Sequence, residues 1–269
     1  MSNQPLPVFI ISYNRGDMLR RCIQGMSRMD TELQFIIHDN GSNDASTIET
    51  INQLEASGIT VYRYDTINRP ADLNRANESV QKFFSSQRLQ PSKYAVTDCD
   101  IDMSIARADS IDIYAKLLDL HDDIGCAGPM LRIHNIPKTY PLYNRVMNRH
   151  IHQFWSKKPT WMRIDSERIA TQECLIDTTF ALHRAGEDFR RLKRALRVYE
   201  PFEALHLDWY VDSITSENSY CTTSGDRISH WNNYKHFCEH QNDALEHTEY
   251  IRVEIGIDGQ PREVLERIA

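Results

Sequence analysis

The first hundred residues alternate between short apolar runs and segments with helical periodicity. Apolar runs stand at residues 7–12 (PVFIIS), 33–38 (LQFIIH), 59–64 (ITVYRY) and 93–98 (KYAVTD), with a turn and a helix-like segment after each of the first three. Strands that alternate with helices pair in parallel through right-handed crossovers, since the helix returns the chain to the same end of the sheet. This order predicts an α/β fold with a mixed, mostly parallel central sheet flanked by helices.

The order is less regular beyond residue 105, and we expect an irregular C-terminal half. The expected elements are a helix over 104–123, strands over 124–133 and 171–184, an irregular wall over 137–172, a basic helix or loop over 186–197, and a C-terminal hairpin over 249–269 whose turn is IDGQP. The chain has no internal repeat and no low-complexity linker, so we expect a single domain over residues 1–269.

Composition and charge exclude several classes of protein. The net charge of −7 is unlike the basic face of a nucleic-acid-binding protein, so we expect no nucleic-acid partner. No apolar run approaches the ~20 residues of a membrane span, and the N-terminus lacks the features of a signal peptide. The six scattered cysteines form no CxxC pair and are expected to be free thiols. These features favour a cytoplasmic protein without an integral membrane segment; peripheral membrane association stays open.

Polar clusters follow three of the expected strands. They read SYNR (12–15), HDNGSND (38–44) and TDCDID (97–102). Ligands in open α/β sheets bind beyond the carboxyl ends of the strands, so we expect the clusters to line one crevice. Simpler interpretations stay open: Asn14 and Asp17 could cap the first helix, and residues 39–42 could form only a turn.

Three aspartates, Asp98, Asp100 and Asp102, lie two residues apart at the end of the fourth apolar run. Carboxylates repel each other and lose free energy on burial, so their clustering calls for a compensating charge. Aspartates at this spacing on a strand point the same way, and Mg²⁺ and Mn²⁺ prefer carboxylate and phosphate oxygens. The cluster favours a site for Mn²⁺ or Mg²⁺ together with a diphosphate.

Two other classes of protein use similar acidic runs. An EF-hand loop would need glycine where Met103 stands, and a helix would have to precede it. A haloacid dehalogenase-type phosphatase carries its aspartate pair after the first strand, with threonine or valine at the position of Asp102. Both alternatives stay open with lower weight.

The ordered motifs PVFIISYNR, FIIHDNGSND, NRPADLNRAN and YAVTDCDID cover roughly residues 7–105. Together they resemble the nucleotide-binding half of GT-A glycosyltransferases, closest to family 2. The resemblance implies a nucleotide-diphospho-sugar donor, with a UDP-sugar favoured, bound by residues 1–105, and an acceptor half over residues 106–248. It implies these site residues: Ser12, Tyr13, Asn14 and Arg15 lining the nucleotide pocket, Asp39 at the base, Arg75 or Asn77 near the ribose or diphosphate, and Asp98 and Asp100 at the metal and ribose.

The resemblance extends more loosely into the second half. DTTFALHR (177–184) is similar to the strand below the acceptor, and HLDWYVD (206–212) to the motif that carries the general base. Because Leu207 takes the first acidic place, the resemblance assigns the base to Asp208, with His206 and Asp212 as alternatives. ISHWNN (228–233) is similar to a late metal-binding motif, which implies that His230 joins Asp100 at the metal.

The activity implied is inverting, metal-dependent sugar transfer to a hydroxyl of a glycan or another acceptor, in bacterial surface polysaccharide synthesis. A retaining outcome stays open. Two other functions also stay open: nucleotidyl transfer on a similar fold, which usually needs a more glycine-rich loop than SYNRGDMLRR, and a non-catalytic module that binds nucleotides or sugars.

Overall fold

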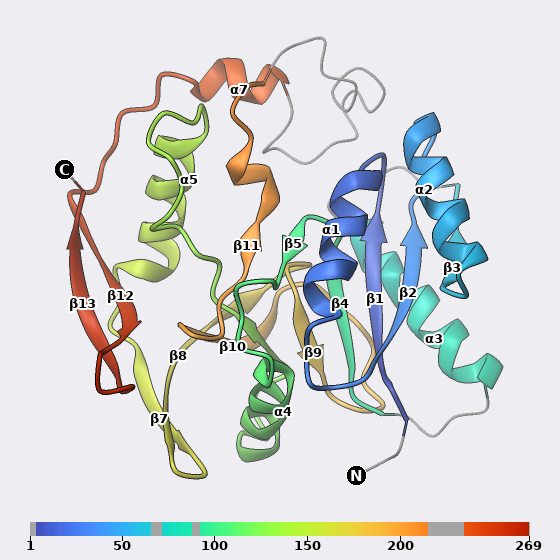
Figure 1. The fold of residues 1–269 in the computed structure, drawn as a ribbon, viewed down its shortest axis with the longest axis horizontal. Coiled ribbons are helices and arrows are strands. Elements are labelled where there is room, and N and C mark those ends of the chain that lie inside the picture. Colours follow the sequence, from blue (N-terminus) through green and yellow to red (C-terminus); the bar gives the residue numbers. More distant parts are fainter. Residues whose placement is uncertain (1–3, 66–71, 88–91, 215–233, 269) are drawn as a thin grey trace.

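The computed structural model describes residues 4–65, 72–87, 92–214 and 234–268, and its centre is a nine-stranded sheet in the order β3-β2-β1-β4-β9-β6-β10-β8-β7 (Figure 1). The strands of this sheet are β1 (Leu6–Ser12), β2 (Leu33–Asp39), β3 (Thr60–Arg63), β4 (Tyr94–Asp98), β6 (Cys126–Pro129), β7 (Thr160–Ile164), β8 (Glu167–Ile176), β9 (Ala181–His183) and β10 (Lys193–Val198). The pairings give seven strands one direction and reverse only β9 and β8. The expected α/β fold with a mixed, mostly parallel sheet is confirmed.

Two small sheets complete the described strands. β5 (Ile101–Asp102) pairs antiparallel with β11 (Leu205–His206), and β12 (Glu249–Ile255) pairs antiparallel with β13 (Pro261–Arg267). The second pair is the hairpin expected from the IDGQP turn, and it lies at the opposite end of the molecule from β3 (Figure 1).

Helices cover both faces of the sheet. The described helices are α1 (Gly16–Met26), α2 (Ala45–Ala56), α3 (Ala76–Gln87), α4 (Ser110–Leu120), α5 (Tyr143–His150) and α7 (Tyr234–His240), with 3-10 turns at Asp72–Arg75 and Leu207–Tyr210 and a π turn at Ile151–Trp155. Side chains alternate along β1, so Val8 faces a core shared with α1, α2 and α4, while Phe9 faces a second core shared with α3. β1 is therefore buried on both sides.

Three regions differ from the sequence-based expectation. The strand expected over 171–184 is interrupted at 177–180, between the end of β8 and β9. Residues 137–172 are not an irregular wall, because they contain α5, β7 and most of β8, with Asp165 at φ 52° in the β7–β8 turn. Residues 186–197 are neither a helix nor only a loop, because β10 occupies their second half. β10 lies inside the sheet and is buried on both faces, so it lacks the alternation typical of a half-exposed strand.

The order of the strands places a topological switch point beside β1. Its neighbour β2 leads to the sheet edge on one side, and β4 leads into the rest of the sheet on the other. Strand order therefore reverses next to β1, and such a switch point is where ligands bind in open α/β sheets.

Candidate functional site

The three polar clusters meet at one edge of the sheet. In the parallel register Ser12 lies opposite Asp39, and Ile11 lies opposite Asp98. The ends of β1, β2 and β4 therefore stand side by side, as the crevice predicted from the sequence requires.

Asn14 fastens two of these strand ends to each other. Its backbone N–H donates to Ser42 Oγ over 3.0 Å, and its Oδ1 accepts from the N–H of Asn43 over 2.8 Å. The residue adopts φ 50°, a left-handed conformation that asparagine tolerates better than most residues. Asn14 therefore does not cap α1: the N-cap position belongs to Arg15, and no side chain caps it.

The expected nucleotide-pocket residues are buried at this edge. Asp39 is 4% exposed and accepts from Ser42 Oγ over 2.5 Å, and burial raises the pKa of its carboxyl group. Ser12 Oγ and the Tyr13 hydroxyl are buried with no hydrogen-bond partner among the described residues. Buried hydroxyls without partners are uncommon, and here they leave polar capacity for a ligand.

Two of the clustered aspartates have separate partners. Asp98 accepts from Thr178 Oγ1 over 2.5 Å, and burial together with the charge of Asp100 raises its pKa. Asp102 accepts from Arg21 Nε over 2.9 Å and from the N–H of Ser104 over 2.8 Å, which anchors α1. A strand precedes the run and its carboxylates diverge, so the EF-hand alternative is wrong.

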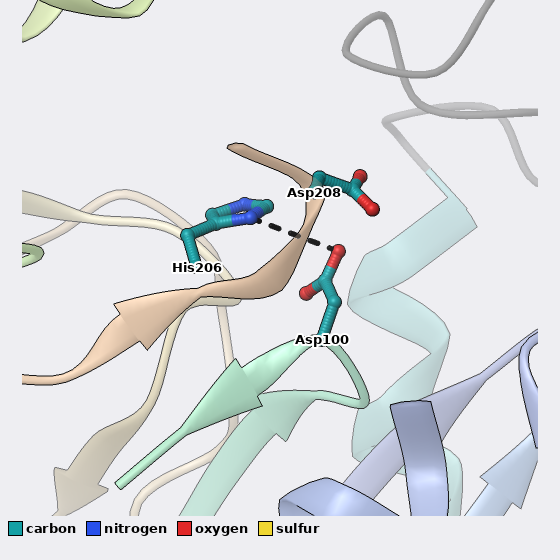
Figure 2. Close-up of side chains that lie close together, drawn as sticks. All are labelled: Asp100, His206 and Asp208. Carbon is teal, nitrogen blue, oxygen red and sulfur yellow. Dashed lines mark ion pairs between the residues drawn. The ribbon is translucent and has the colours of Figure 1, made fainter. Parts of the chain in front are cut away.

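The third aspartate, Asp100, meets residues about a hundred positions later in the chain. Pairing of β5 with β11 places Ile101 opposite His206, and the N–H of Leu207 donates to the Asp100 carbonyl over 2.7 Å. Figure 2 shows the carboxyl groups of Asp100 and Asp208 and the imidazole of His206 close together. One ligand atom from each lies within 4.8 Å of the other two, and all three residues are buried.

Arg15 spans the two carboxylates of this cluster. Its Nη1 donates to Asp100 Oδ2 over 2.5 Å, and its Nη2 donates to Asp208 Oδ2 over 2.8 Å. His206 Nδ1 lies 3.9 Å from Asp100 Oδ2 and its ring stacks on Trp209 at 4.7 Å between centroids. Burial of two acids beside each other is tolerated here because one guanidinium faces both.

The two carboxyl groups have pKa values shifted in opposite directions. Burial is the main cause that raises the pKa of Asp208 to about 6; the charge of Arg15 opposes this shift and the charge of Asp100 adds to it. Burial also acts to raise the pKa of Asp100, but the charges of His206 and Arg15 outweigh burial and lower it. Paired acids with separated pKa values are typical of functional sites.

The cluster fits a divalent cation chemically. Two carboxylates and an imidazole are ligands that Mn²⁺ accepts, and Mg²⁺ accepts the carboxylates. Asp100 Oδ1 is buried with no hydrogen-bond partner among the described residues, so it is available as a ligand. Asp98 is not a member of this cluster, and His230 lies outside the described residues.

His206 was considered from the sequence only as an alternative base, and its place among the possible ligands was missed. The signal was present: His206 and Asp208 are two residues apart, the same spacing as Asp98 and Asp100. The other expected base, Asp212, is exposed and has no place in this cluster.

Arg75 and Asn77 make contacts away from the cluster. Arg75 Nε donates to Glu78 Oε1 over 2.8 Å, and its guanidinium lies 5.8 Å from the ring centroid of Tyr64. Asn77 Oδ1 accepts from the N–H of Phe189 over 2.8 Å and so holds the loop before β10 against α3. A role for either residue at a ribose or diphosphate stays a prediction.

None of the helices in the described residues combines the length and hydrophobicity needed to cross a bilayer. The five described cysteines are free thiols, as expected, and Cys221 lies outside the described residues.

No protein-family model matches the chain, and comparison with curated proteins gives no match either. Among solved structures, the chain is similar to the mannosyltransferase PcManGT of Pyrobaculum calidifontis in complex with GDP-Man and Mn²⁺, at 13% identity over 68% of this chain and a TM-score of 0.41. It is also similar to residues 1–349 of S. aureus TarS (11% identity over 67% of this chain, TM-score 0.38) and to glucosyl-3-phosphoglycerate synthase of Mycobacterium tuberculosis in complex with UDP (15% over 68%, TM-score 0.36). These alignments cover 45%, 47% and 58% of the three proteins, so this chain spans less than two thirds of each.

Proposed function

We propose that this protein is a metal-dependent glycosyltransferase that moves a sugar from a nucleotide-diphosphate donor to a hydroxyl group of an acceptor. The observation that carries the proposal is the buried cluster of Asp100, His206 and Asp208 beside the carboxyl ends of β1 and β4. Clustered acids at a switch point of an α/β sheet suit a cation and a diphosphate that bind together. The sequence motifs that resemble family 2 supply the reaction type.

The donor would occupy the crevice between the strand ends. Ser12 and Tyr13 offer hydroxyls without partners among the described residues, and Asp39 is the proposed partner of the nucleotide base. Asp98, which accepts a hydrogen bond from Thr178 at the end of β4, is proposed to bind the ribose or the cation. Asp100 and His206 are the proposed ligands of Mn²⁺ or Mg²⁺, with His230 as a further proposed ligand. A bound divalent cation would neutralise the charge that develops on the leaving diphosphate.

Asp208 is the proposed general base. A carboxyl group with a pKa of about 6 is largely ionised near neutral pH and is a stronger base than an ordinary aspartate, which suits deprotonation of an acceptor hydroxyl. The same residue is also a possible metal ligand, and a carboxylate bound to a cation is a weaker base. The two roles predict different effects of Asp208→Asn: loss of the base lowers kcat alone, whereas loss of a ligand also weakens Mn²⁺ binding.

The finer assignments are parts of the same proposal. Direct attack by an acceptor oxygen activated by Asp208 would invert the anomeric centre. We favour a UDP-sugar as donor, a glycan of bacterial surface polysaccharide synthesis as acceptor, and a cytoplasmic location, which the free thiols support.

Thermal unfolding with nucleoside diphosphates tests the donor site. UDP, GDP, ADP, CDP and dTDP are each added with and without Mn²⁺. A ligand at 100 times its Kd adds about 2.7 kcal/mol of stability, which is roughly 5–10 °C in Tm for a chain of this size. We expect such a shift only when Mn²⁺ and one nucleotide are both present. When an acceptor is added, we expect the protein to release that nucleotide from the corresponding nucleotide-sugar.

Two aspartate variants make the test specific to the cluster. Asp100→Asn should abolish the shift that needs Mn²⁺, whereas Asp165→Asn, an exposed position on the β7–β8 turn, should retain it. No shift with any pair would overturn the donor site. A shift without turnover for any sugar donor of that nucleotide would instead favour a non-catalytic binding module.

A further inference from the structure

The guanidinium of Arg15 occupies the centre of the carboxylate cluster. It donates one hydrogen bond to Asp100 and another to Asp208, and the side chains of all three residues are at most 8% exposed. The two acids come from distant segments that the β5–β11 pairing brings together. A single guanidinium at the start of α1 therefore faces both the proposed metal ligand Asp100 and the proposed base Asp208.

Arg15 and a divalent cation compete for the same carboxylate oxygens. Arg15 uses Oδ2 of Asp100 and Oδ2 of Asp208, so the open oxygen at Asp100 is Oδ1. Two cations a few ångströms apart in a buried site repel each other strongly. Full binding of a divalent cation by both acids thus requires the guanidinium to move away.

The backbone near Arg15 is firmly held, so the side chain is the part that can move. Asn14 before it is hydrogen-bonded to residues 42–44, and the N–H of Gly16 after it donates to Thr47 Oγ1 over 3.0 Å. The arginine side chain has several rotatable bonds, and its planar fork pairs with phosphate oxygens as well as with carboxylates. A diphosphate in the crevice would give the guanidinium a second anionic partner.

We propose that Arg15 is an internal counter-cation that exchanges between two sets of partners, the carboxylates of Asp100 and Asp208 and the diphosphate of the donor. When the diphosphate binds the guanidinium of Arg15, the carboxylate oxygens that it had occupied become available to the metal ion. Metal and nucleotide then bind with positive coupling, and by thermodynamic linkage each tightens the other by the same factor. The inference rests on the proposed function and adds a positioning role for Arg15.

Direct measurement of Mn²⁺ binding tests this role. Free Mn²⁺ is quantified by electron paramagnetic resonance, with and without the nucleoside diphosphate that gives the largest thermal shift. We expect that nucleotide to tighten Mn²⁺ binding to the native protein by about tenfold or more, within the usual range of coupling between sites. Arg15→Met should bind Mn²⁺ alone about tenfold more tightly than the native protein, and the nucleotide should then add little.

Two further variants separate competition from structural damage. Arg21→Ala removes another arginine–aspartate pair from α1 and should leave Mn²⁺ affinity and coupling as in the native protein. Arg15→Lys keeps the charge but lacks the fork that spans both acids, so it should lie between the native protein and Arg15→Met. A distorted site would lose metal affinity, whereas competition predicts a gain. If Arg15→Met does not fold, the Mn²⁺ affinity of Arg15→Lys, compared with that of the native protein, tests the competition by itself.

The outcomes distinguish the inference from the proposed function. If the native protein binds Mn²⁺ and nucleotide but neither Arg15 variant binds Mn²⁺ more tightly, the counter-cation role is overturned and the glycosyltransferase proposal stands. If the native protein binds neither Mn²⁺ nor any nucleoside diphosphate, the proposed function itself fails. If Mn²⁺ and nucleotide bind independently, the coupling is refuted while both sites remain.

Discussion

Replacing Asp208 by asparagine should change how the stability of the protein depends on pH. The carboxyl group of Asp208 is completely buried, and burial with the nearby charge of Asp100 raises its pKa from 3.8 to about 6. A carboxyl group whose pKa is higher in the folded state stabilises that state while it is protonated, below pH 3.8. This stabilisation is lost as the pH rises from 3.8 through 6, because in that range the unfolded chain has released the proton of Asp208 while the folded state still binds it.

The size of the effect follows from the shift. The difference of about 2 pKa units corresponds to about 3 kcal/mol, at about 1.4 kcal/mol per unit. Asparagine keeps the shape and an oxygen that can accept from Arg15 but does not titrate. The free energy of unfolding of Asp208→Asn, minus that of the native protein, should therefore increase by about 2.4 kcal/mol between pH 4 and pH 8, nearly all of it below pH 7, because at pH 4 the unfolded chain has already released part of its proton.

Urea unfolding, followed by tryptophan fluorescence at closely spaced pH values, measures this difference, since Trp209 adjoins the cluster. Asp212→Asn is the matched control: it makes the same change four residues away at an exposed position and should unfold in parallel with the native protein. Parallel curves for Asp208→Asn and the native protein would refute the reasoning. They would mean that Asp208 gives up its proton as easily in the folded state as in the unfolded chain.

Two further predictions concern stability: the close packing of β6 against β9, and the hydrogen bond that holds Asp98. Gly128→Ala should destabilise the protein by about 1–3 kcal/mol in urea unfolding, because the added methyl group would overlap the backbone oxygen of Phe180. Gly125→Ala is the control: its tightest contact would be Lys193 Cδ at 3.1 Å, a side-chain atom that can shift, and its contact with the Arg194 backbone oxygen at 3.5 Å is ordinary, so near-native stability is expected. Thr178→Val should cost about 1 kcal/mol, because it removes the hydrogen bond to Asp98, whereas Thr178→Ser should retain most of that stability. Equal stability of the two Thr178 variants would show that the bond contributes nothing.

The sheet and the meeting of its polar strand ends followed from local patterns in the sequence. Apolar runs that alternate with helical segments make parallel pairing the simplest arrangement, and the ends of β1, β2 and β4 then meet whatever the remaining chain does. The convergence of Ser12, Asp39 and Asp98 was predictable for that reason.

The C-terminal half was harder to predict from the sequence, because its charged residues concealed a buried strand. The basic stretch 186–197 suggested a helix or a loop, yet its second half forms β10, which lies inside the sheet between β6 and β8. Its Arg197 is 3% exposed and tolerates burial because it donates to the Pro129 carbonyl and to Thr179 Oγ1. These hydrogen-bond acceptors belong to β6 and to the segment before β9, so the sequence around Arg197 does not reveal them.

The sequence by itself determined that acidic groups gather at a strand end, and only the tertiary structure decided what each of them faces. Asp98 meets Thr178, Asp102 meets Arg21, and Asp100 meets Asp208 across the guanidinium of Arg15. The reason is physical. Spacing along a strand sets the direction of a side chain, whereas neutralising a buried carboxylate depends on groups that pairing such as β5 with β11 brings from about a hundred residues away.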